Sequence, residues 1–340
     1  MQKTQEHDTS LTEGGTFLLC VPAGWDAYIS LEFYELQQGL VGCGWTKVVI
    51  DEVDDAVIIE EINRARVVLL WEAYELLERN ASLLCNNAHI SNAKRIIFCD
   101  DVHFFTQHRR DQRLRAFEWA ELILATYPDK LKEWFPEVEQ HKIRWTPHSA
   151  ASYFKTDIFV PSSDRILLSG SRTWPYPFRQ FCQAKLPESV CHVVDHPGYP
   201  GYPGDKMNNM RANASALMHL GGKSYAELLR SHPAMIVCGS IFGYLVAKVF
   251  EGMAAGCLTI CERASLGGRL TALGFIEDVH YVGTDFQTVI SDSIDIRDAF
   301  LGGDQKIKDI ITAAHIRSAE HTTAARVVQI NNICMEDVVI

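Results

Sequence analysis

The amino-acid sequence predicts an α/β protein with two doubly wound, Rossmann-like parallel sheets and a cleft between them. At 340 residues the chain is too long for one ordinary core, so two domains of roughly 150 residues each are expected. Short apolar runs alternate with longer amphipathic segments, which is the pattern of parallel strands joined by helices. This alternation stops near residue 146, stays irregular to about residue 163 and then resumes, which indicates a crossing between two domains.

The first half of the chain contains six apolar runs that we interpret as buried strands. The segments between them carry helical spacing, as at Leu31, Tyr34 and Leu36. The predicted strands span residues 16–21, 46–50, 67–71, 94–99, 122–126 and 143–145.

The second half repeats the pattern with five predicted strands, at residues 165–169, 190–194, 234–238, 258–261 and 280–282. Helices are predicted between them at 178–184, 223–230 and 245–255, and two more over 306–333. The resulting domain boundaries are a polar tail at 1–15, a first Rossmann-like domain at 16–150, a second at 160–315, and a C-terminal helix at 316–340 that packs back on the first domain.

Composition favours a folded protein of the cytoplasm. Hydrophobic residues make up 47% and charged residues 22% of the chain, which is typical of a globular protein. The formal charge of −11 argues against nucleic acid or an anionic membrane as the main partner. The ten cysteines are scattered singly, which fits a reducing compartment, and there is neither a signal-like start nor an apolar stretch of ~18 residues that could span a membrane.

Ligands of open parallel sheets bind beyond the carboxyl ends of the strands, so the segments that follow the strands were searched for functional residues. The strand at 234–238 is followed by a loop and then by a helix that carries Lys248 and Glu251 on one face. The amino end of such a helix and its loop offer N–H groups to a diphosphate, and Glu251 can accept hydrogen bonds from ribose hydroxyls. Taken alone, the pair is better explained as a surface ion pair on an amphipathic helix, and it is the neighbouring segments that favour a binding site.

The strand at 165–169 is followed by the small residues Ser169, Gly170 and Ser171. A glycine-containing loop at this position lets the backbone approach a phosphate closely. Arg172 and Arg179, which follow it, supply positive charge.

The strand at 94–99 ends in Asp100, Asp101 and His103. An aspartate or histidine at this edge can take a proton from an acceptor hydroxyl, and a neighbouring like charge raises the pKa of one carboxylate. The alternative is that Asp100 caps a turn and His103 only packs. Two acids and one histidine are too few to indicate a metal site.

These segments together resemble the family-one-type glycosyltransferases, particularly the branch related to spore-maturation glycosyltransferases. The resemblance covers roughly residues 98–283, and it rests on the runs FCDDVH, RWTPHSA, LLSGSRTWPYPFR, DHPGYP and KVFEGMAAGCLTICE. It implies the GT-B fold, with an N-terminal acceptor domain and a C-terminal nucleotide-sugar domain. Many retaining members carry a glutamate eight residues before the ribose glutamate, whereas this chain has Gly243 there, so the stereochemistry stays open.

The resemblance also implies roles for individual residues. Glu251 would hold the donor ribose, and Lys248 and Arg179 would lie near the diphosphate. The other donor-site residues implied are Ser240, Gly243 and Tyr244 near the donor sugar, His196, Gly198 and Tyr199 near the nucleotide, and Ser169, Gly170, Ser171 and Arg172. Asp101 and His103, with Asp100, would be the catalytic group on the acceptor side.

The function expected from this resemblance is transfer of a hexose or pentose from a nucleoside diphosphate sugar to a glycan or other hydroxyl acceptor. No cofactor and no metal are expected, because backbone dipoles and basic side chains can stabilise the leaving diphosphate. Two alternatives remain, a nucleotide-sugar epimerase of the same fold and a non-catalytic nucleotide-sugar binding protein. The sequence leaves the sugar, the base, the acceptor and the oligomeric state undetermined.

Overall fold

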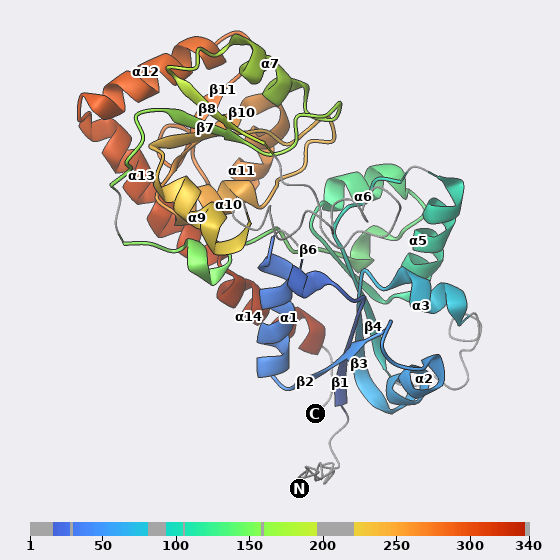
Figure 1. Ribbon diagram of the computed structural model, residues 1–340. Coiled ribbons are helices and arrows are strands. Elements are labelled where there is room, and N and C mark those ends of the chain that lie inside the picture. The colour runs from blue at the N-terminus through green and yellow to red at the C-terminus, as the bar shows by residue number, and fades with distance from the viewer. Residues whose placement is uncertain are drawn as a thin grey trace, which may run out of the picture.

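The computed structural model describes residues 16–27, 30–80, 93–104, 106–157, 160–195 and 221–336. These residues form two lobes, each built on one sheet that is covered by helices (Figure 1). In both sheets, every pair of neighbouring strands is parallel. The carboxyl ends of all strands in a sheet therefore lie at one edge.

The first sheet has six strands in the order β2-β1-β3-β4-β5-β6. In β1, Leu18 and Cys20 pack into the core on one face of the sheet and Leu19 and Val21 into the core on the other, because successive side chains of a strand point to opposite faces. Burial on both faces explains why these strands read as continuous apolar runs. The strands are β1 Thr16–Val21, β2 Trp45–Val49, β3 Ala65–Trp71, β4 Lys94–Cys99, β5 Leu122–Ala125 and β6 Ile143–Trp145.

Helices of the first lobe lie on both faces of its sheet (Figure 1). The apolar side of a helix packs on the sheet, as α2 shows. Its residues Ile58 and Ile62 lie one turn apart on one side of the helix and are fully buried against the sheet. The described elements are η1 Trp25–Ala27, α1 Glu32–Gly42, α2 Asp55–Arg64, α3 Tyr74–Arg79, α5 Gln107–Trp119, α6 Pro128–Trp134 and η2 Gln140–Lys142.

The second sheet has five strands in the order β11-β10-β9-β7-β8. They are β7 Ile166–Ser169, β8 Cys191–Val194, β9 Ala234–Val237, β10 Leu258–Glu262 and β11 Val282–Thr284. The helical elements of this lobe are α7 Pro177–Lys185, α9 Gly222–Arg230, α10 Lys248–Ala254, η5 Arg263–Gly267, α11 Gly268–Ala272, α12 Val289–Leu301 and α13 Gln305–Ser318.

The chain crosses between the lobes twice. The first crossing follows β6 and includes η3 (Ser152–Phe154), and the second runs through η6 (Ala319–His321) from α13 to α14 (Thr323–Met335). The two crossings pair directly, because Ala150 N–H donates to the His321 carbonyl at 2.8 Å and Thr323 N–H to the Ala150 carbonyl at 2.9 Å. The last helix, α14, packs against α1 of the first lobe (Figure 1), so the chain ends on the lobe where it began.

Two predicted elements in the second lobe begin two or three residues too early. The last strand begins at Val282 rather than at 280, because the Tyr281 carbonyl accepts a hydrogen bond from Asp278 in a turn where Asp278 has φ +60°. The helix predicted from residue 245 begins at Lys248, because Tyr244 and Leu245 are buried in hydrophobic cores instead of continuing the helix.

Candidate active site

The carboxyl ends of the two sheets face each other across a cleft lined by residues from both lobes. Its second-lobe wall includes the loop after β7, where Gly170 adopts φ +105°, a conformation that favours glycine. A Cβ at this residue would lie 2.8 Å from Arg179 Nη1 and 3.2 Å from Lys248 Cε. Two basic side chains thus converge on a bare stretch of backbone, which is the arrangement expected of a phosphate site.

Arg179 and Lys248 are held in place by neutral partners. The Arg179 side chain is 2% exposed and donates from Nη1 to the Ser171 carbonyl at 3.1 Å and from Nη2 to the Cys238 carbonyl at 3.3 Å. Lys248 Nζ donates to the Tyr225 hydroxyl at 3.0 Å. Within the described residues neither cation has a carboxylate within 4.0 Å. Buried charges are normally paired, so this cleft contains positive charge that an anionic ligand would compensate.

Glu251 lies one helical turn after Lys248 on α10 and lines the same cleft. The residue is 5% exposed, and its carboxylate makes no hydrogen bond to the part of the chain that the structure describes. Burial raises the pKa of Glu251 to about 7, although the Lys248 charge opposes this shift. A buried carboxylate that opens only into a cleft is suited to accept hydrogen bonds from ligand hydroxyls.

The raised pKa of Glu251 predicts a pH-dependent cost in stability. The folded state binds this proton more tightly than the unfolded chain, so stability is lost as the pH rises from about 4.5, the ordinary pKa of the group, through about 7. Glu251→Gln should therefore raise the free energy of unfolding at pH 8 by roughly 1–3 kcal/mol and by less at pH 5. Urea unfolding at both pH values measures this.

The matched control for that experiment is Glu227→Gln, which alters an exposed glutamate on α9. Its effect should be small at both pH values. Equal effects of the two substitutions, or a Glu251→Gln effect that does not grow with pH, would contradict the burial of an uncompensated carboxylate in the cleft.

The loop between β9 and α10 reaches across the cleft to the first lobe. Tyr244 stacks on Tyr127 with ring centroids 3.9 Å apart, and Phe242 stacks on His103 at 5.2 Å. Tyr244 is accordingly part of the first lobe's hydrophobic core. The loop thereby fixes the distance between α10 and the carboxyl ends of the first sheet.

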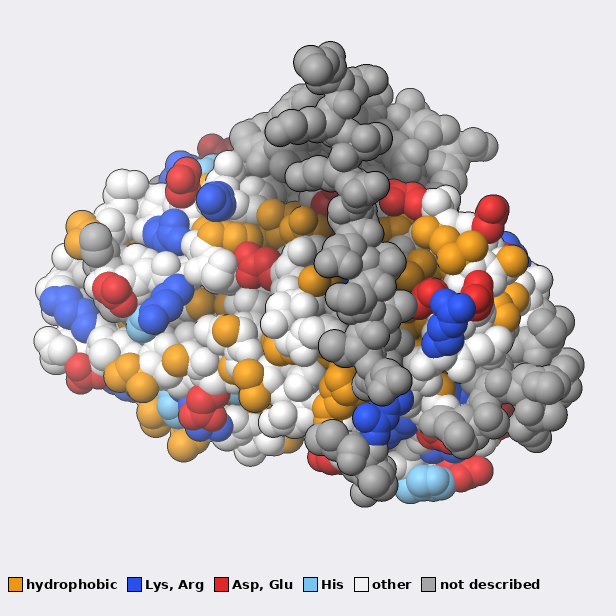
Figure 2. Space-filling view, turned by 90° about the horizontal axis from the view of Figure 1, so that it is seen from below, with side chains coloured by type: hydrophobic (Ala, Val, Ile, Leu, Met, Phe, Trp, Pro, Cys, Tyr) orange, Lys and Arg blue, Asp and Glu red, His pale blue; other side chains and the backbone are white. Residues whose placement is uncertain are grey.

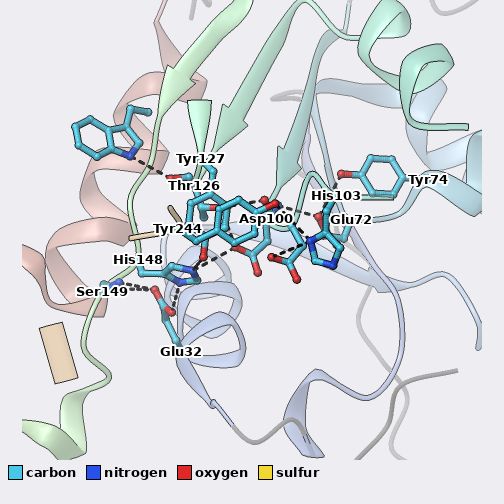
Figure 3. Close-up of polar contacts among 12 residues, drawn as sticks. Glu32, Glu72, Tyr74, Asp100, His103, Thr126, Tyr127, His148, Ser149 and Tyr244 are labelled. Atoms are coloured by element: carbon cyan, nitrogen blue, oxygen red, sulfur yellow. Dashed lines mark hydrogen bonds and ion pairs between the residues drawn. The ribbon is translucent and has the colours of Figure 1, made fainter. Parts of the chain in front are cut away.

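Carboxylates gather at the carboxyl ends of β3 and β4, where Glu72 and Asp100 lie close together (Figure 3) and Asp101 follows Asp100 in the chain. Glu72 follows β3 in a left-handed conformation, φ +53°, which is unusual for a non-glycine residue. One of its oxygens accepts the Asp100 N–H at 2.8 Å and the Tyr74 hydroxyl at 3.2 Å. Burial raises the pKa of Glu72 to about 7. Glu72 thus fixes the turn that carries Asp100 and Asp101.

A buried relay connects Asp100 to the start of α1 (Figure 3). Glu32 accepts a hydrogen bond from His148 Nδ1 at 2.7 Å, and it also accepts the Ser149 hydroxyl at 2.9 Å. His148 Nε2 lies 3.3 Å from Asp100 Oδ1 and 2.8 Å from the Tyr127 hydroxyl. Burial alone would lower the pKa of His148, but the two carboxylates raise it well above its usual range. The two carboxylates therefore favour the charged form of the ring.

The two neighbouring aspartates differ in their surroundings. Asp100 Oδ1 also accepts the Thr126 hydroxyl at 2.8 Å, so this oxygen is already hydrogen-bonded within the protein. The Asp101 side chain is half-exposed toward the cleft, yet protein surrounds its carboxyl closely enough for desolvation to raise its pKa, and the charges of Asp100 and Glu72 raise it further. This combination is that of a general base, which needs access to substrate and a pKa above the ordinary aspartate range.

His103 lies beside Asp101, with Nδ1 3.8 Å from Asp101 Oδ1 and 3.4 Å from the Tyr244 hydroxyl. Burial lowers the pKa of His103, and the nearby Arg113 guanidinium lowers it further. The ring is thus neutral near pH 7 and lies beside Asp101, just behind the residues that line the cleft.

Comparison with known proteins gives a match in structure alone. No protein-family model matches the chain, and no curated protein matches its sequence. A glycosyltransferase from Rickettsia africae ESF-5 is 14% identical with a TM-score of 0.62, and the match covers 96% of this chain and 99% of that one. Anabaena HepE, solved with UDP and glucose, is 12% identical with a TM-score of 0.63 over 95% of this chain and 100% of its own.

A third solved structure is an α-glucosyltransferase in complex with UDP-glucose and DNA containing an abasic site. It is 13% identical with a TM-score of 0.63, and the match covers 94% of this chain and 99% of that one. Each of the three matches covers at least 94% of this chain, which has two parallel sheets. The chain has the GT-B fold.

Within the GT-B cleft the structure brings together most of the predicted site. The predicted residues that line the cleft are Ser169, Gly170, Ser171, Arg179, Tyr244, Lys248 and Glu251 from the second lobe, and Asp100 and Asp101 from the first. His103 contacts this cleft through Tyr244. His196, Gly198 and Tyr199 lie outside the described residues.

Three predicted residues lie elsewhere. Arg172 is not a lining residue itself, because its guanidinium is engaged by two residues that are, pairing with Asp195 and donating to the Val194 carbonyl. Ser240 and Gly243 line a second pocket, beside Arg269. Gly243 has φ +66°, and a Cβ there would lie 3.0 Å from Arg269 Nη1, so a glutamate at this position would be strained.

The prediction missed three residues of this GT-B site, namely Glu32, Glu72 and His148. Glu72 directly follows a predicted strand, so the same search of strand ends could have found it. Glu32 and His148 are 116 residues apart in sequence, and no local pattern links them.

The described residues contain neither a candidate membrane span nor a candidate metal site. No helix in them is long and apolar enough to cross a bilayer. No three or more His, Cys, Asp or Glu side chains in them are arranged to hold a metal ion.

Proposed function

We propose that the chain is a glycosyltransferase that moves a sugar from a nucleoside diphosphate sugar to a hydroxyl acceptor. The observation that carries the proposal is the convergence of Arg179 and Lys248 on Gly170 without a carboxylate partner in the described structure. The open carboxylate of Glu251 beside them supports a ligand that has both phosphates and hydroxyls. Two structural neighbours were solved with UDP or UDP-glucose, which makes uridine donors the first to test.

Each part of the site has a role in this reaction. The diphosphate rests on the Gly170 backbone, where Arg179 and Lys248 stabilise the charge that develops as the bond between the anomeric carbon and the phosphate oxygen breaks. Glu251 accepts hydrogen bonds from the donor ribose. The acceptor oxygen forms the new bond to the anomeric carbon, and its proton passes to Asp101. Because two cations already face the leaving group, the proposed reaction requires neither a metal nor a cofactor.

The acceptor we propose is a glycan or another small hydroxyl compound, and the sugar is a hexose or a pentose. One structural neighbour was solved with DNA. This chain carries a formal charge of −11, and on the face in Figure 2 its Lys and Arg side chains are interspersed with Asp and Glu. That distribution disfavours duplex DNA, because nucleic-acid binding needs a continuous basic surface.

We also propose that the protein acts in the cytoplasm. The described cysteines are all free, and most of them are buried in apolar surroundings. Such usage suits a reducing compartment.

A donor and acceptor screen tests the function. The protein is incubated with UDP-, GDP-, ADP- and dTDP-sugars, with and without a panel of mono- and oligosaccharides, and release of nucleoside diphosphate is measured. We expect release that depends on an acceptor and that yields a glycosylated product. A changed nucleotide sugar formed without any acceptor would identify an epimerase, and donor binding without turnover across the panel would identify a binding protein.

A further inference from the structure

A second hollow, of about 410 Å³, lies where the chain crosses between the lobes. Its walls come from both crossings, with Trp145 and Pro147 on the first and His321 and Arg326 on the second. Arg317, from the end of α13, completes the wall beside the second lobe. None of these side chains lines the active-site cleft, so we treat the hollow separately and call it the hinge pocket.

Arg326 of α14 places a nearly uncompensated charge in this pocket. The residue is 5% exposed, and its guanidinium contacts Gln329, the His148 carbonyl at 3.3 Å and His321 Nδ1 at 3.1 Å, all of which are neutral acceptors. Among the described residues it has no carboxylate within 4.0 Å and its Nε has no partner. Burial lowers the pKa of Arg326 to about 10; Glu32 opposes this shift but is already hydrogen-bonded to His148.

Arg317 adds a second positive charge to the hinge pocket. Its Nη1 pairs with Glu320 at 2.7 Å, its Nη2 donates to the Leu273 carbonyl at 2.8 Å, and its Nε has no described partner. The Glu320 side chain is 60% exposed, so solvent screens this pair and it offsets little of the charge inside the pocket.

The pKa of His321 responds to the positive charge in the hinge pocket. Burial lowers its pKa to about 4, and the positive charges of Arg326 and Arg317 contribute to this shift. Burial is the main reason why this imidazole is neutral, and the two arginines beside it add positive charge that the solvent-exposed Glu320 carboxylate offsets little. An oxyanion would fit here, because the guanidinium fork matches the geometry of phosphate.

We propose that the hinge pocket binds a small phosphate-bearing anion between Arg317 and Arg326. This site is separate from the diphosphate site at Gly170. Because Arg326 also donates to the His148 carbonyl, the same guanidinium links the pocket to the relay beneath Asp100. Occupancy stabilises the mutual position of α13 and α14, and with it the mutual position of the two lobes (Figure 1).

Calorimetric titration with inorganic phosphate tests this proposal in full-length protein carrying Lys248→Gln, which weakens the diphosphate site. We expect one binding event. Arg317→Gln in that background should weaken it about tenfold or more, since it removes a charge-assisted hydrogen bond, whereas Glu320→Gln should tighten it. Acetate at equal ionic strength is the second arm and should bind much more weakly.

His321 provides an independent readout by NMR. Bound phosphate should raise the pKa of His321, because it neutralises the two arginines. This measurement tests whether phosphate binds in the hinge pocket even if Arg317→Gln fails to fold. The proposal is overturned by the absence of phosphate binding in the Lys248→Gln protein, by equal affinities in the Arg317 and Glu320 variants, or by acetate binding as tightly as phosphate. An unchanged His321 pKa at saturating phosphate would likewise place the anion elsewhere.

Discussion

Replacement of Asp101 by Asn should lower kcat by about 10²- to 10⁴-fold, which is the usual contribution of a general base. Asparagine has nearly the same shape but cannot take the acceptor's proton. Donor affinity should stay unchanged, because the groups expected to contact the diphosphate and ribose lie on the second lobe. Steady-state kinetics and donor calorimetry on the two proteins separate the two effects.

The pH dependence of the native protein's activity is a second test of Asp101 as the general base. Desolvation, followed by the charges of Asp100 and Glu72, raises the pKa of Asp101, and the base acts only when deprotonated. Activity should therefore rise with pH through an inflection above the ordinary aspartate range, and Asp101→Asn should remove this inflection. Asp129→Asn, on the exposed first turn of α6, is the matched control and should keep both the rate and the profile.

Full turnover by the Asp101→Asn protein would exclude Asp101 as the base. His103 would then be the next candidate, because its ring is neutral and lies 3.8 Å from Asp101. Asp100 is the weaker choice, since its Oδ1 already contacts the Thr126 hydroxyl at 2.8 Å and His148 Nε2 at 3.3 Å.

The fold could be predicted because its strands are buried on both faces. In β3, from Ala65 to Trp71, and in β9, from Ala234 to Val237, almost every side chain is buried, so these strands read as uninterrupted apolar runs. The amino end of α10 could not be predicted in the same way. Leu245 continues the helical spacing of the residues after it, but the preceding Tyr244 packs across the cleft into the first lobe's core, and the helix begins only at Lys248.

The candidate-site residues that directly follow a strand could be predicted from the sequence. Those that meet only through tertiary contacts could not. Gly170 directly follows β7, and Asp101 comes just after the end of β4. The position of each residue after a strand was enough to identify it. Glu32 reads as an ordinary acidic residue in the first turn of a helix. Its role appears only when β6 and the crossing bring His148 within 2.7 Å of it.

Gly170→Ala should abolish most of the donor affinity. The glycine has φ +105°, and an added Cβ would lie 2.8 Å from Arg179 Nη1 and 3.2 Å from Lys248 Cε. The methyl group would occupy the space proposed for the diphosphate and displace the two cations. Loss of one or two charge-assisted hydrogen bonds, each contributing about 1.5–3 kcal/mol, predicts an affinity at least about tenfold lower.

Gly44→Ala is the matched control for this substitution. Gly44 has φ +94°, and an added Cβ would meet no atom within 4 Å, so alanine there imposes similar backbone strain without touching the cleft. Both variants should lose some stability, as measured by thermal unfolding in the absence of ligand. A selective loss of donor affinity in Gly170→Ala therefore separates the site from the strain.

The central claim is that this cleft binds the diphosphate of a nucleotide sugar on the Gly170 backbone between Arg179 and Lys248. Calorimetric titration of the native, Gly170→Ala and Gly44→Ala proteins with UDP, GDP, ADP and dTDP tests it most directly. We predict that at least one nucleoside diphosphate binds the native and Gly44→Ala proteins alike and binds Gly170→Ala at least about tenfold more weakly. Equal affinity for all three proteins, or no binding of any nucleoside diphosphate to the native protein, would contradict it.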